Sequence, residues 1–267
     1  MNAEMVFRKT NAHVGRQISV TPANSTNKHL AYGRILLNEK ERLVSFANGD
    51  RETGLIVLSG TAKVTSDGTS FDLGKYDSIY IPRDSSIEVE TSDRVDIAEF
   101  SCQVAGRYPL KLVPYAEVCK DPTLKFSPGT PGQQRDVSIT LGKNVDAGRL
   151  LLGFTVSEPG NWTSWPPHEH AVMLEEMYVY FDMPEPAFGI QMVYNDTRYP
   201  EMVTVVRDGD AVTIPSGYHP NASVPGHRIS FLWALAAHRE KEDRLFGVVN
   251  IQPDFAPAGS GAPTNRK

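Results

Sequence analysis

The sequence predicts an all-β protein made of two antiparallel β-barrels in one chain. Apolar and polar residues alternate with a period of two in both halves, and Asp-Gly and Gly turns separate these runs. No sustained helical repeat interrupts this pattern. Glycine and proline, 21 and 19 of 267 residues, make up about 15% of the chain against roughly 12% on average, which favours many turns and short strands.

The first half contains short runs typical of antiparallel strands. Asp67-Gly68 marks a turn between two of these runs, and Gly60 and Gly74 end others. The strands expected here cover residues 56–58, 62–65, 70–73, 78–82 and 87–90.

The second half repeats this order of strands and turns. Its first strand is expected at 150–156, and the others at 177–181, 189–194, 202–206, 212–215 and 229–235. Asp208-Gly209 followed by Ile214-Pro215 parallels Asp67-Gly68 followed by Ile81-Pro82 in the first half. This similarity predicts an internal duplication.

Domain limits follow from composition. Pro128, Gly129, Pro131 and Gly132 crowd into one stretch, which is typical of a connection between domains. We expect an N-terminal barrel at 1–122, a linker at 123–136, a C-terminal barrel at 137–256 and a disordered tail at 257–267.

The charge and the cysteines bound the cellular setting. A net charge of −5 and a pI near 5.8 argue against a nucleic-acid partner. The sequence contains no run of about 18 apolar residues, so we expect no membrane span. The first thirty residues lack the apolar core of a signal peptide, and Cys102 and Cys119 are too few for a disulfide framework. We therefore expect a cytoplasmic protein with reduced thiols.

Three histidines in the second half have the spacing of metal ligands. His168 and His170 are two residues apart, so on a strand they point to the same face, roughly 6.6 Å apart along the chain. His219 follows in the segment Pro215-Ser216-Gly217-Tyr218-His219. Neutral imidazoles with one carboxylate suit zinc, manganese, iron or nickel and leave positions open for a substrate.

The carboxylate is one of two neighbouring glutamates. Glu176 is in phase with Tyr178 and Tyr180 on the polar and aromatic face of its strand, whereas Glu175 is in phase with apolar residues. We therefore choose Glu176 over Glu175 as the fourth ligand. His168, His170, Glu176 and His219 together match the two cupin motifs, which predicts a metal-binding jelly-roll barrel. The first half has no histidine at corresponding positions, so we expect it to be structural.

The motifs around these ligands resemble the 5-deoxy-glucuronate isomerase family of myo-inositol catabolism, which is a bicupin family similar to the 5-keto-4-deoxyuronate isomerases. The resemblance covers most of the chain. It rests on Glu52-Thr53-Gly54-Leu55, Trp165-Pro166-Pro167-His168-x-His170, Leu174-Glu175-Glu176-Met177-Tyr178, Gln191-x-Val193-Tyr194, Gly209-Asp210 and Pro215-x-Gly217-Tyr218-His219-Pro220.

The resemblance implies a metal-dependent aldose–ketose isomerase that converts 5-deoxy-D-glucuronate to 5-dehydro-2-deoxy-D-gluconate. It implies a divalent ion, zinc or manganese ahead of iron or nickel, and a small sugar acid as substrate. Such an isomerisation needs no redox cofactor, which agrees with the lack of a dinucleotide or P-loop motif. Because two-barrel cupins associate through exposed sheet edges and faces, we expect a homo-oligomer, at least a dimer.

The residues that move protons are less well defined than the ligands. We select Tyr178, Gln191 and Tyr218 as catalytic residues, with Gln191 orienting substrate hydroxyls rather than acting as a base. The wider set of candidates for the base and for the substrate carboxylate comprises Glu175, Tyr180, Tyr194, Arg198, Arg207 and Arg228.

One feature of the sequence leaves other functions open. Only residues 171–174 separate His170 from the glutamate pair, whereas the family commonly has a longer loop there. The substrate is then either 5-deoxy-glucuronate or another deoxy uronate or sugar acid. A cupin dioxygenase and a non-catalytic sugar-binding cupin are the remaining alternatives.

Overall fold

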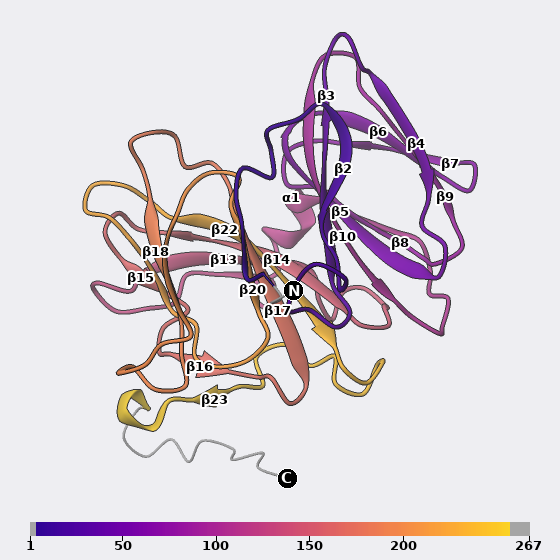
Figure 1. The fold of residues 1–267 in the computed structure, drawn as a ribbon. Helices are drawn as coiled ribbons and strands as arrows, with labels where there is room; N and C mark the ends of the chain where they lie inside the picture. Colours follow the sequence, from indigo (N-terminus) through magenta and orange to yellow (C-terminus); the bar gives the residue numbers. More distant parts are fainter. Residues whose placement is uncertain (1–3, 257–267) are drawn as a thin grey trace.

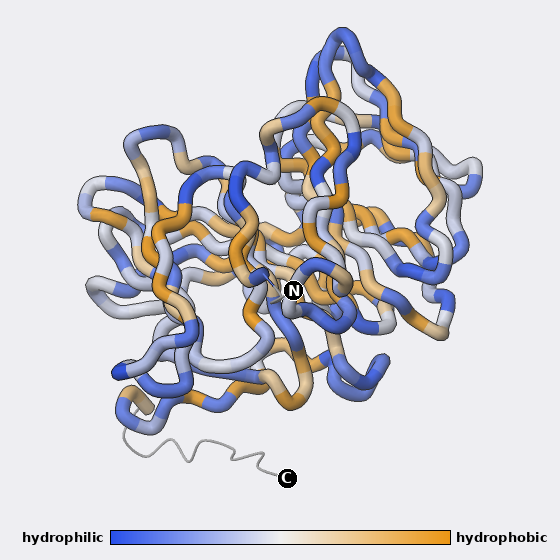
Figure 2. Tube along the Cα trace, in the orientation of Figure 1, coloured by the Kyte–Doolittle hydropathy of each residue, from blue (hydrophilic) through white to orange (hydrophobic). Residues whose placement is uncertain are grey.

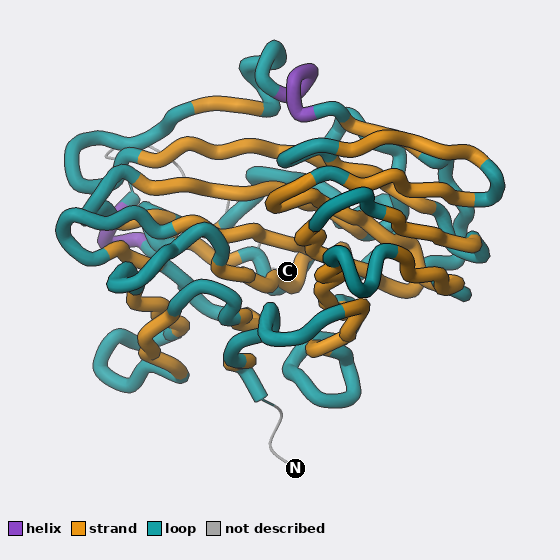
Figure 3. Tube along the Cα trace, turned by 90° about the horizontal axis from the view of Figure 1, so that it is seen from above, coloured by secondary structure: helices purple, strands orange, loops and turns teal. Residues whose placement is uncertain are grey.

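The computed structural model describes residues 4–256. This part of the chain consists of β-strands and connecting turns, with one helical turn at Tyr115–Val118 (α1) and one 3-10 turn at Pro253–Phe255 (Figures 1 and 3). The predicted all-β fold is confirmed. The tail expected at 257–267 lies outside the described residues. Within residues 4–256, neither helical segment has the length or apolar character needed to cross a membrane.

The N-terminal half forms two antiparallel sheets. The larger has the strand order β11-β8-β5-β10-β3-β2, and the smaller has the order β4-β9-β6-β7. The strands are Gly15–Val20 (β2), Ala31–Leu37 (β3), Leu43–Ala47 (β4), Arg51–Gly60 (β5), Ala62–Ser66 (β6), Thr69–Leu73 (β7), Ser78–Ile81 (β8), Ser86–Glu90 (β9), Val95–Gln103 (β10) and Lys111–Val113 (β11).

The C-terminal half forms a seven-stranded, a four-stranded and a two-stranded sheet. Their orders are β1-β20-β17-β22-β14-β13-β12, β15-β21-β18-β19 and β16-β23. The strands are Val6–Phe7 (β1), Lys125–Phe126 (β12), Arg135–Leu141 (β13), Leu150–Ser157 (β14), Trp162–Thr163 (β15), His168–Glu169 (β16), Leu174–Tyr180 (β17), Gly189–Val193 (β18), Met202–Val206 (β19), Ala211–Ile214 (β20), Asn221–Ser223 (β21), Ser230–Ala237 (β22) and Asn250–Ile251 (β23).

The two halves share one strand order. In the larger sheets, β8-β5-β10-β3-β2 corresponds to β20-β17-β22-β14-β13, and in the smaller sheets β4-β9-β6-β7 corresponds to β15-β21-β18-β19. The internal duplication predicted from the turn pattern is therefore present in the topology.

The larger sheets of the two halves pack against each other and share one hydrophobic core. Tyr32 and Ile56 face this shared core, while Ile35 and Leu55, on the same two strands, face a separate core inside the N-terminal half. Because successive side chains on a strand point to opposite faces of the sheet, each strand contributes residues to both cores. Figure 2 shows the hydrophobic stretches along the strands and the polar ones on the outer loops. A Cβ on Gly54 would clash with the Leu152 side chain, so glycine permits the close approach of the two sheets.

One N-terminal segment and part of the expected linker belong to the C-terminal sheet. Val6–Phe7 (β1) pairs with β20 of the C-terminal sheet, and the start of the described chain lies against that half in Figure 1. Lys125–Phe126 (β12) pairs with β13 inside the stretch that was expected to be a linker. The proline- and glycine-rich residues 128–132 form only the turn between these two strands.

Candidate metal centre

Three histidines from separate segments converge in the C-terminal half. His168 lies on β16, His170 directly follows that strand, and His219 lies between β20 and β21. A nitrogen of each ring lies within 4.8 Å of the other two, and no second group of this kind occurs within residues 4–256. His170 and His219 are buried, whereas His168 is half-buried. The structure thus assembles the three imidazoles that the sequence predicted.

Backbone carbonyls orient all three rings in the same way. The Nδ1 atoms of His168, His170 and His219 lie 2.9, 3.1 and 2.9 Å from the carbonyl oxygens of Pro166, Leu174 and Gly217. A carbonyl oxygen only accepts, so each Nδ1–H donates. The Nε2 atom of each ring is then left to act as a metal ligand, an arrangement typical of histidine ligands.

The Glu176 carboxylate completes the cluster. Its Oε2 lies 3.1 Å from Nε2 of His170 and 2.9 Å from Nε2 of His219. Despite this distance, the buried His219 Nε2 has no hydrogen-bond partner among the described residues. Buried polar atoms are usually paired, so a nitrogen lone pair held against a carboxylate without a hydrogen bond fits a cation between them. The donor set therefore suits a divalent metal ion.

The ionisation of Glu176 and of His168 favours metal binding. Burial raises the pKa of Glu176, but the favourable interactions with His170 and His219 outweigh burial and bring this pKa to about 2. Burial and the two neighbouring histidines lower the pKa of His168 to about 3. For His170, burial lowers the pKa, but the interaction with Glu176 outweighs it and raises the pKa above its usual value. At neutral pH, Glu176 is anionic and His168 is neutral, which are the forms that bind metal.

The neighbouring Glu175 points away from the histidines and has a different role. Its carboxylate accepts hydrogen bonds from the backbone N–H groups of Lys28, His29 and Leu30, at 2.7, 2.8 and 2.6 Å. These groups belong to the N-terminal half, just before β3. The structure thus brings Glu176 and not Glu175 to the cluster, and it leaves Glu175 no access to a substrate.

The short connection after His170 forms a tight turn. The backbone N–H groups of Met173 and Leu174 donate to the His170 carbonyl, at 3.0 and 2.9 Å. Because Leu174 also accepts the bond from the His170 ring, the turn fixes both the backbone and the ring of this residue. The brevity of the segment therefore strengthens the placement of His170.

Gln191 lies behind His219 and does not face an open space. It is fully buried, its Oε1 accepts a hydrogen bond from the Tyr180 hydroxyl, and its Nε2 donates to the His219 carbonyl at 3.1 Å. Nε2 also donates to Met192 O at 2.7 Å. The amide is thus committed to internal partners that hold the His219 loop in place.

Tyr178 lies beside the cluster. Its ring centroid is 5.8 Å from that of His219, and its hydroxyl lies 2.7 Å from Ser164 Oγ. Burial, reinforced by the nearby Glu176 charge, raises the Tyr178 pKa well above its usual value, so the hydroxyl stays protonated. This phenol can donate a hydrogen bond but cannot serve as a base at neutral pH.

Tyr218 precedes His219 and is half-buried. It pairs with Tyr194 through backbone hydrogen bonds of 2.8 and 3.0 Å, and the two rings are 5.7 Å apart. The Tyr194 hydroxyl donates to Gln252 Oε1 at 2.8 Å, which ties the C-terminal segment to this side of the site.

The arginines proposed for the substrate carboxylate are exposed. Arg198, Arg207 and Arg228 all lie on the surface, and Arg228 is 3.6 Å from Glu158. Sequence reasoning did not single out Arg135, which is half-buried at the start of β13 and hydrogen-bonded to the Trp165 carbonyl. The signal available was the even spacing of Arg135 from the apolar Val137 and Ile139, which puts all three on one face of a strand that begins at the end of the expected linker.

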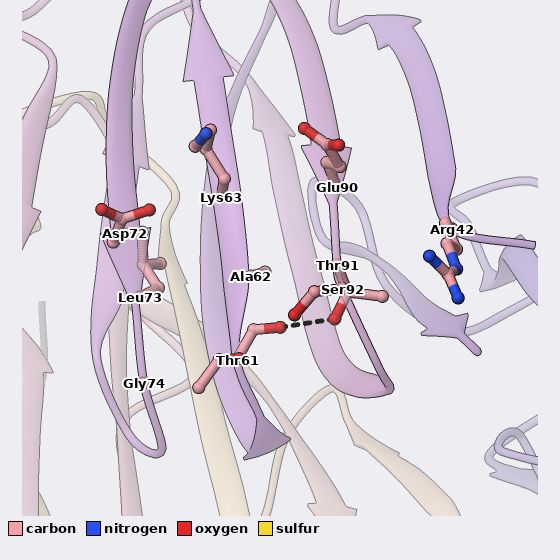
Figure 4. Close-up of a pocket in the computed structure, with 10 residues that line it drawn as sticks. All are labelled: Arg42, Thr61, Ala62, Lys63, Asp72, Leu73, Gly74, Glu90, Thr91 and Ser92. Carbon is pink, nitrogen blue, oxygen red and sulfur yellow. Dashed lines mark hydrogen bonds between the residues drawn. The ribbon is translucent and has the colours of Figure 1, made fainter. Parts of the chain in front are cut away.

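A separate cavity of about 580 Å³ lies on the outer sheet of the N-terminal half (Figure 4). Lys63 on β6 stands in register between Asp72 on β7 and Glu90 on β9. These opposite charges on neighbouring strands form a polar ladder. The cavity has no histidine or cysteine in its lining and is formed by the half that lacks the three-histidine cluster.

The sequence matches the KduI/IolB family over residues 5–248. A 5-deoxy-glucuronate isomerase of Geobacillus kaustophilus is 29% identical over 240 residues, covering 83% of this chain and 84% of the relative. A 4-deoxy-L-threo-5-hexosulose-uronate ketol-isomerase of Caldicellulosiruptor bescii is 28% identical over 197 residues, covering 71% and 68%.

Solved structures share the fold. The crystal structure of an IolB-like protein from Salmonella typhimurium has a TM-score of 0.84 at 24% identity and covers 95% of this chain and 98% of that chain. A mutant of the oxalate decarboxylase of Bacillus subtilis has a TM-score of 0.63 at 13% identity, with 88% and 77% covered. These likenesses show the cupin-like architecture.

Proposed function

This chain belongs to the KduI/IolB family, and we propose that it is a metal-dependent isomerase that converts 5-deoxy-D-glucuronate to 5-dehydro-2-deoxy-D-gluconate. The names of its relatives, isomerases of sugar acids, support the reaction class and the type of substrate. The single most important structural support is the convergence of His168, His170 and His219 on the Glu176 carboxylate.

We propose that these four residues hold one divalent cation, with zinc or manganese ahead of iron or nickel. The shared fold with Bacillus subtilis oxalate decarboxylase, described as having Mn(II) centres, is compatible with manganese. Such an ion, when bound, supplies Lewis-acid polarisation of the substrate carbonyl and of the neighbouring hydroxyl. The Nδ1 hydrogen bonds keep the histidines oriented for this purpose.

The remaining residues of the site are proposed to transfer protons, donate hydrogen bonds and position the ligands. The reaction moves a proton from C2 to C1 and the hydroxyl proton from O2 to O1, so the C1 aldehyde becomes an alcohol as C2 becomes a carbonyl and no external oxidant or reductant is needed. Tyr178, which stays protonated beside His219, donates a hydrogen bond to the substrate oxygen where negative charge develops. We assign Tyr218 to the hydroxyl proton and Gln191 to the positioning of His219.

A second candidate is the isomerisation of another deoxy uronate. The similarity to the Caldicellulosiruptor bescii ketol-isomerase favours it, because that relative is named for a different uronate. Both candidates share the metal centre and the reaction type, and they differ in the substrate pocket.

An NMR time course of metal-loaded protein with 5-deoxy-D-glucuronate tests the proposal. We expect the aldehyde-derived signals to fall and ketone signals to grow, and a chelated control to show neither change. No conversion by protein of verified metal content would exclude this substrate. Conversion of only the 4-deoxy uronate would establish the second candidate, and oxygen uptake with ferrous ion would indicate an oxygenase.

We further propose that the protein is cytoplasmic and forms at least a dimer. Cys102 and Cys119 are both free thiols, as expected in a reducing compartment. Apolar side chains on the outer face of the β15-β21-β18-β19 sheet support association, because exposed apolar faces favour contact with a partner. They are Trp162, Ile190, Val203 and Val205. Light scattering that gives the mass of one chain would contradict this oligomeric state.

A further inference from the structure

Arg135 lies on the same face of the seven-stranded sheet as the metal centre. Across the four neighbouring strands β13, β14, β22 and β17, Ile139 pairs with Gly153, Gly153 with Trp233, and Trp233 with Tyr178. Residues directly opposite each other share a face, and residues an even number apart on one strand do too. Arg135 is four residues from Ile139, so its side chain is on the face that carries Tyr178.

The guanidinium contacts the segment that leads to the first histidine. Its Nη2 donates to the Trp165 carbonyl at 2.8 Å, and its Nη1 donates to the Gln133 carbonyl at 2.9 Å. Ser164, directly before Trp165, lies 2.7 Å from the Tyr178 hydroxyl. Arg135 and Tyr178 are also close enough for each charge to influence the pKa of the other. Arg135, Ser164 and Tyr178 thus form one polar group beside the cluster.

The charge of Arg135 has no acidic partner. No carboxylate within residues 4–256 forms an ion pair with it, whereas Arg34 and Arg16, also shielded from solvent, pair with Asp96 and Glu99. Burial lowers the Arg135 pKa, as expected for a cation that has lost water without gaining an anion.

A second shielded arginine shows what a purely structural role looks like. Arg244 also has no acidic partner, but its Nε, Nη1 and Nη2 atoms all donate to backbone carbonyls. Arg135 commits only its two Nη atoms to carbonyls, one bond each, and its Nε–H and the second hydrogen of each Nη stay available. An arginine with free N–H groups and no counter-ion is suited to an anionic ligand.

A uronate has the matching chemistry. It carries the reacting aldehyde at one end and a carboxylate at the other, so a substrate with its aldehyde at the histidines needs a cation on an adjacent wall. We propose that Arg135 binds the substrate carboxylate through its free N–H groups and thereby selects sugar acids over neutral sugars. This role rests on the proposed isomerase function and adds the residue that recognises the acid.

The variants R135Q and R135K test the assignment, with R228Q as the control for loss of an exposed arginine in the same half. Each metal-loaded protein is assayed with 5-deoxy-D-glucuronate and with the neutral aldose 5-deoxy-D-glucose. Metal content and thermal melting are recorded alongside. Binding of the product acid is measured by calorimetry, which needs no turnover of the neutral sugar.

We expect R135Q to raise KM for the acid and weaken product binding by roughly 10- to 100-fold, because a charge-assisted contact is lost. The metal content should stay unchanged, and so should the rate at which the neutral sugar is turned over. R135K keeps the positive charge but lacks the paired N–H donors of the guanidinium, so we expect a smaller increase in KM. This variant tests the assignment if R135Q does not fold. R228Q should match the wild type.

Equal losses with both sugars would overturn the assignment in favour of a structural role for Arg135. Unchanged KM and product affinity in the variants, beside an active wild type, would overturn it as well. An inactive wild type of verified metal content would instead contradict the proposed function, so the two failures are distinguishable.

Discussion

Glu52 and Glu175 make the same contact in opposite directions across the two halves. Glu52 of β5 accepts hydrogen bonds from the three consecutive backbone N–H groups of residues 148–150, each at 2.7 Å. Glu175 of β17 accepts the corresponding three bonds from residues 28–30. In both cases Oε2 takes the first N–H group and Oε1 takes the next two. The duplicated fold thus holds itself together with two equivalent buried carboxylates.

Replacing Glu52 by Gln should destabilise the protein without affecting the metal centre. The glutamine side chain keeps one acceptor oxygen, but its NH2 group would face the backbone N–H donors of residues 148–150. We therefore expect a loss of about 1–3 kcal/mol in the free energy of unfolding. Chemical denaturation measures this loss, and metal analysis of the folded variant provides the control. Wild-type stability in E52Q would contradict the structural role of the contact.

Glu175 and Glu176 offer a matched pair of substitutions. E176Q removes an anionic ligand, so its metal affinity should fall by more than the roughly 10- to 100-fold that loss of an outer partner causes. E175Q should unfold more easily but retain its metal. Competition with a chelator, beside thermal melting, separates the two effects. Metal loss in E175Q with retention in E176Q would reverse the assignment.

Replacing His219 by Ala should abolish both bound metal and turnover. This ring supplies the Nε2 atom that faces the Glu176 carboxylate without a hydrogen bond. Elemental analysis and the isomerase assay check the two expectations together. A variant that lacks metal but turns over at the wild-type rate would refute metal-dependent isomerisation.

Replacing Gln191 by Leu should weaken the centre indirectly. The leucine cannot donate to the His219 carbonyl or accept from the Tyr180 hydroxyl, so the loop that carries His219 loses its support. We expect metal affinity to fall by about 10- to 100-fold. Added metal in excess should restore most of the kcat, whereas a residue that contacts substrate would not be rescued in this way.

Replacing Tyr178 by Phe should lower turnover and leave the metal bound. The phenylalanine keeps the packing against His219 and Phe231 but lacks the hydroxyl that is proposed to donate a hydrogen bond to the substrate. We expect kcat to fall by about 100-fold or more, with little change in metal content. Turnover at the wild-type rate would remove Tyr178 from the reaction.

Removing the metal should lower thermal stability. An ion that binds the folded state alone stabilises it by about 2.7 kcal/mol at a free concentration 100 times its dissociation constant. Chelated protein should therefore melt several degrees below loaded protein, and re-addition of the metal should reverse the change. Identical melting curves, with metal loss verified, would show that the four residues bind no ion in the folded protein.

Local patterns predicted the strands and the ligands because both depend on alternation along a single strand. The strand expected at 202–206 coincides with β19, and the one expected at 150–156 differs from β14 by one residue. Glu176 was correctly placed on the face of Tyr178, since that face follows from parity within β17. The linker expected at 123–136 stays a prediction; within it, Lys125–Phe126 (β12) pairs with β13 across a proline- and glycine-rich turn, which has the composition of a domain connection.

Local patterns in the sequence are enough to predict the all-β class, the duplicated order of strands and turns, and the spacing that lets His168 and His170 share a face. The joining of the halves by Glu175 and the contact of Arg135 with the Trp165 carbonyl depend instead on the three-dimensional packing. The partners of Glu175 are 145–147 residues away in sequence. Hydrogen bonds over such separations depend on how whole sheets pack, and no local alternation of apolar and polar residues encodes that packing.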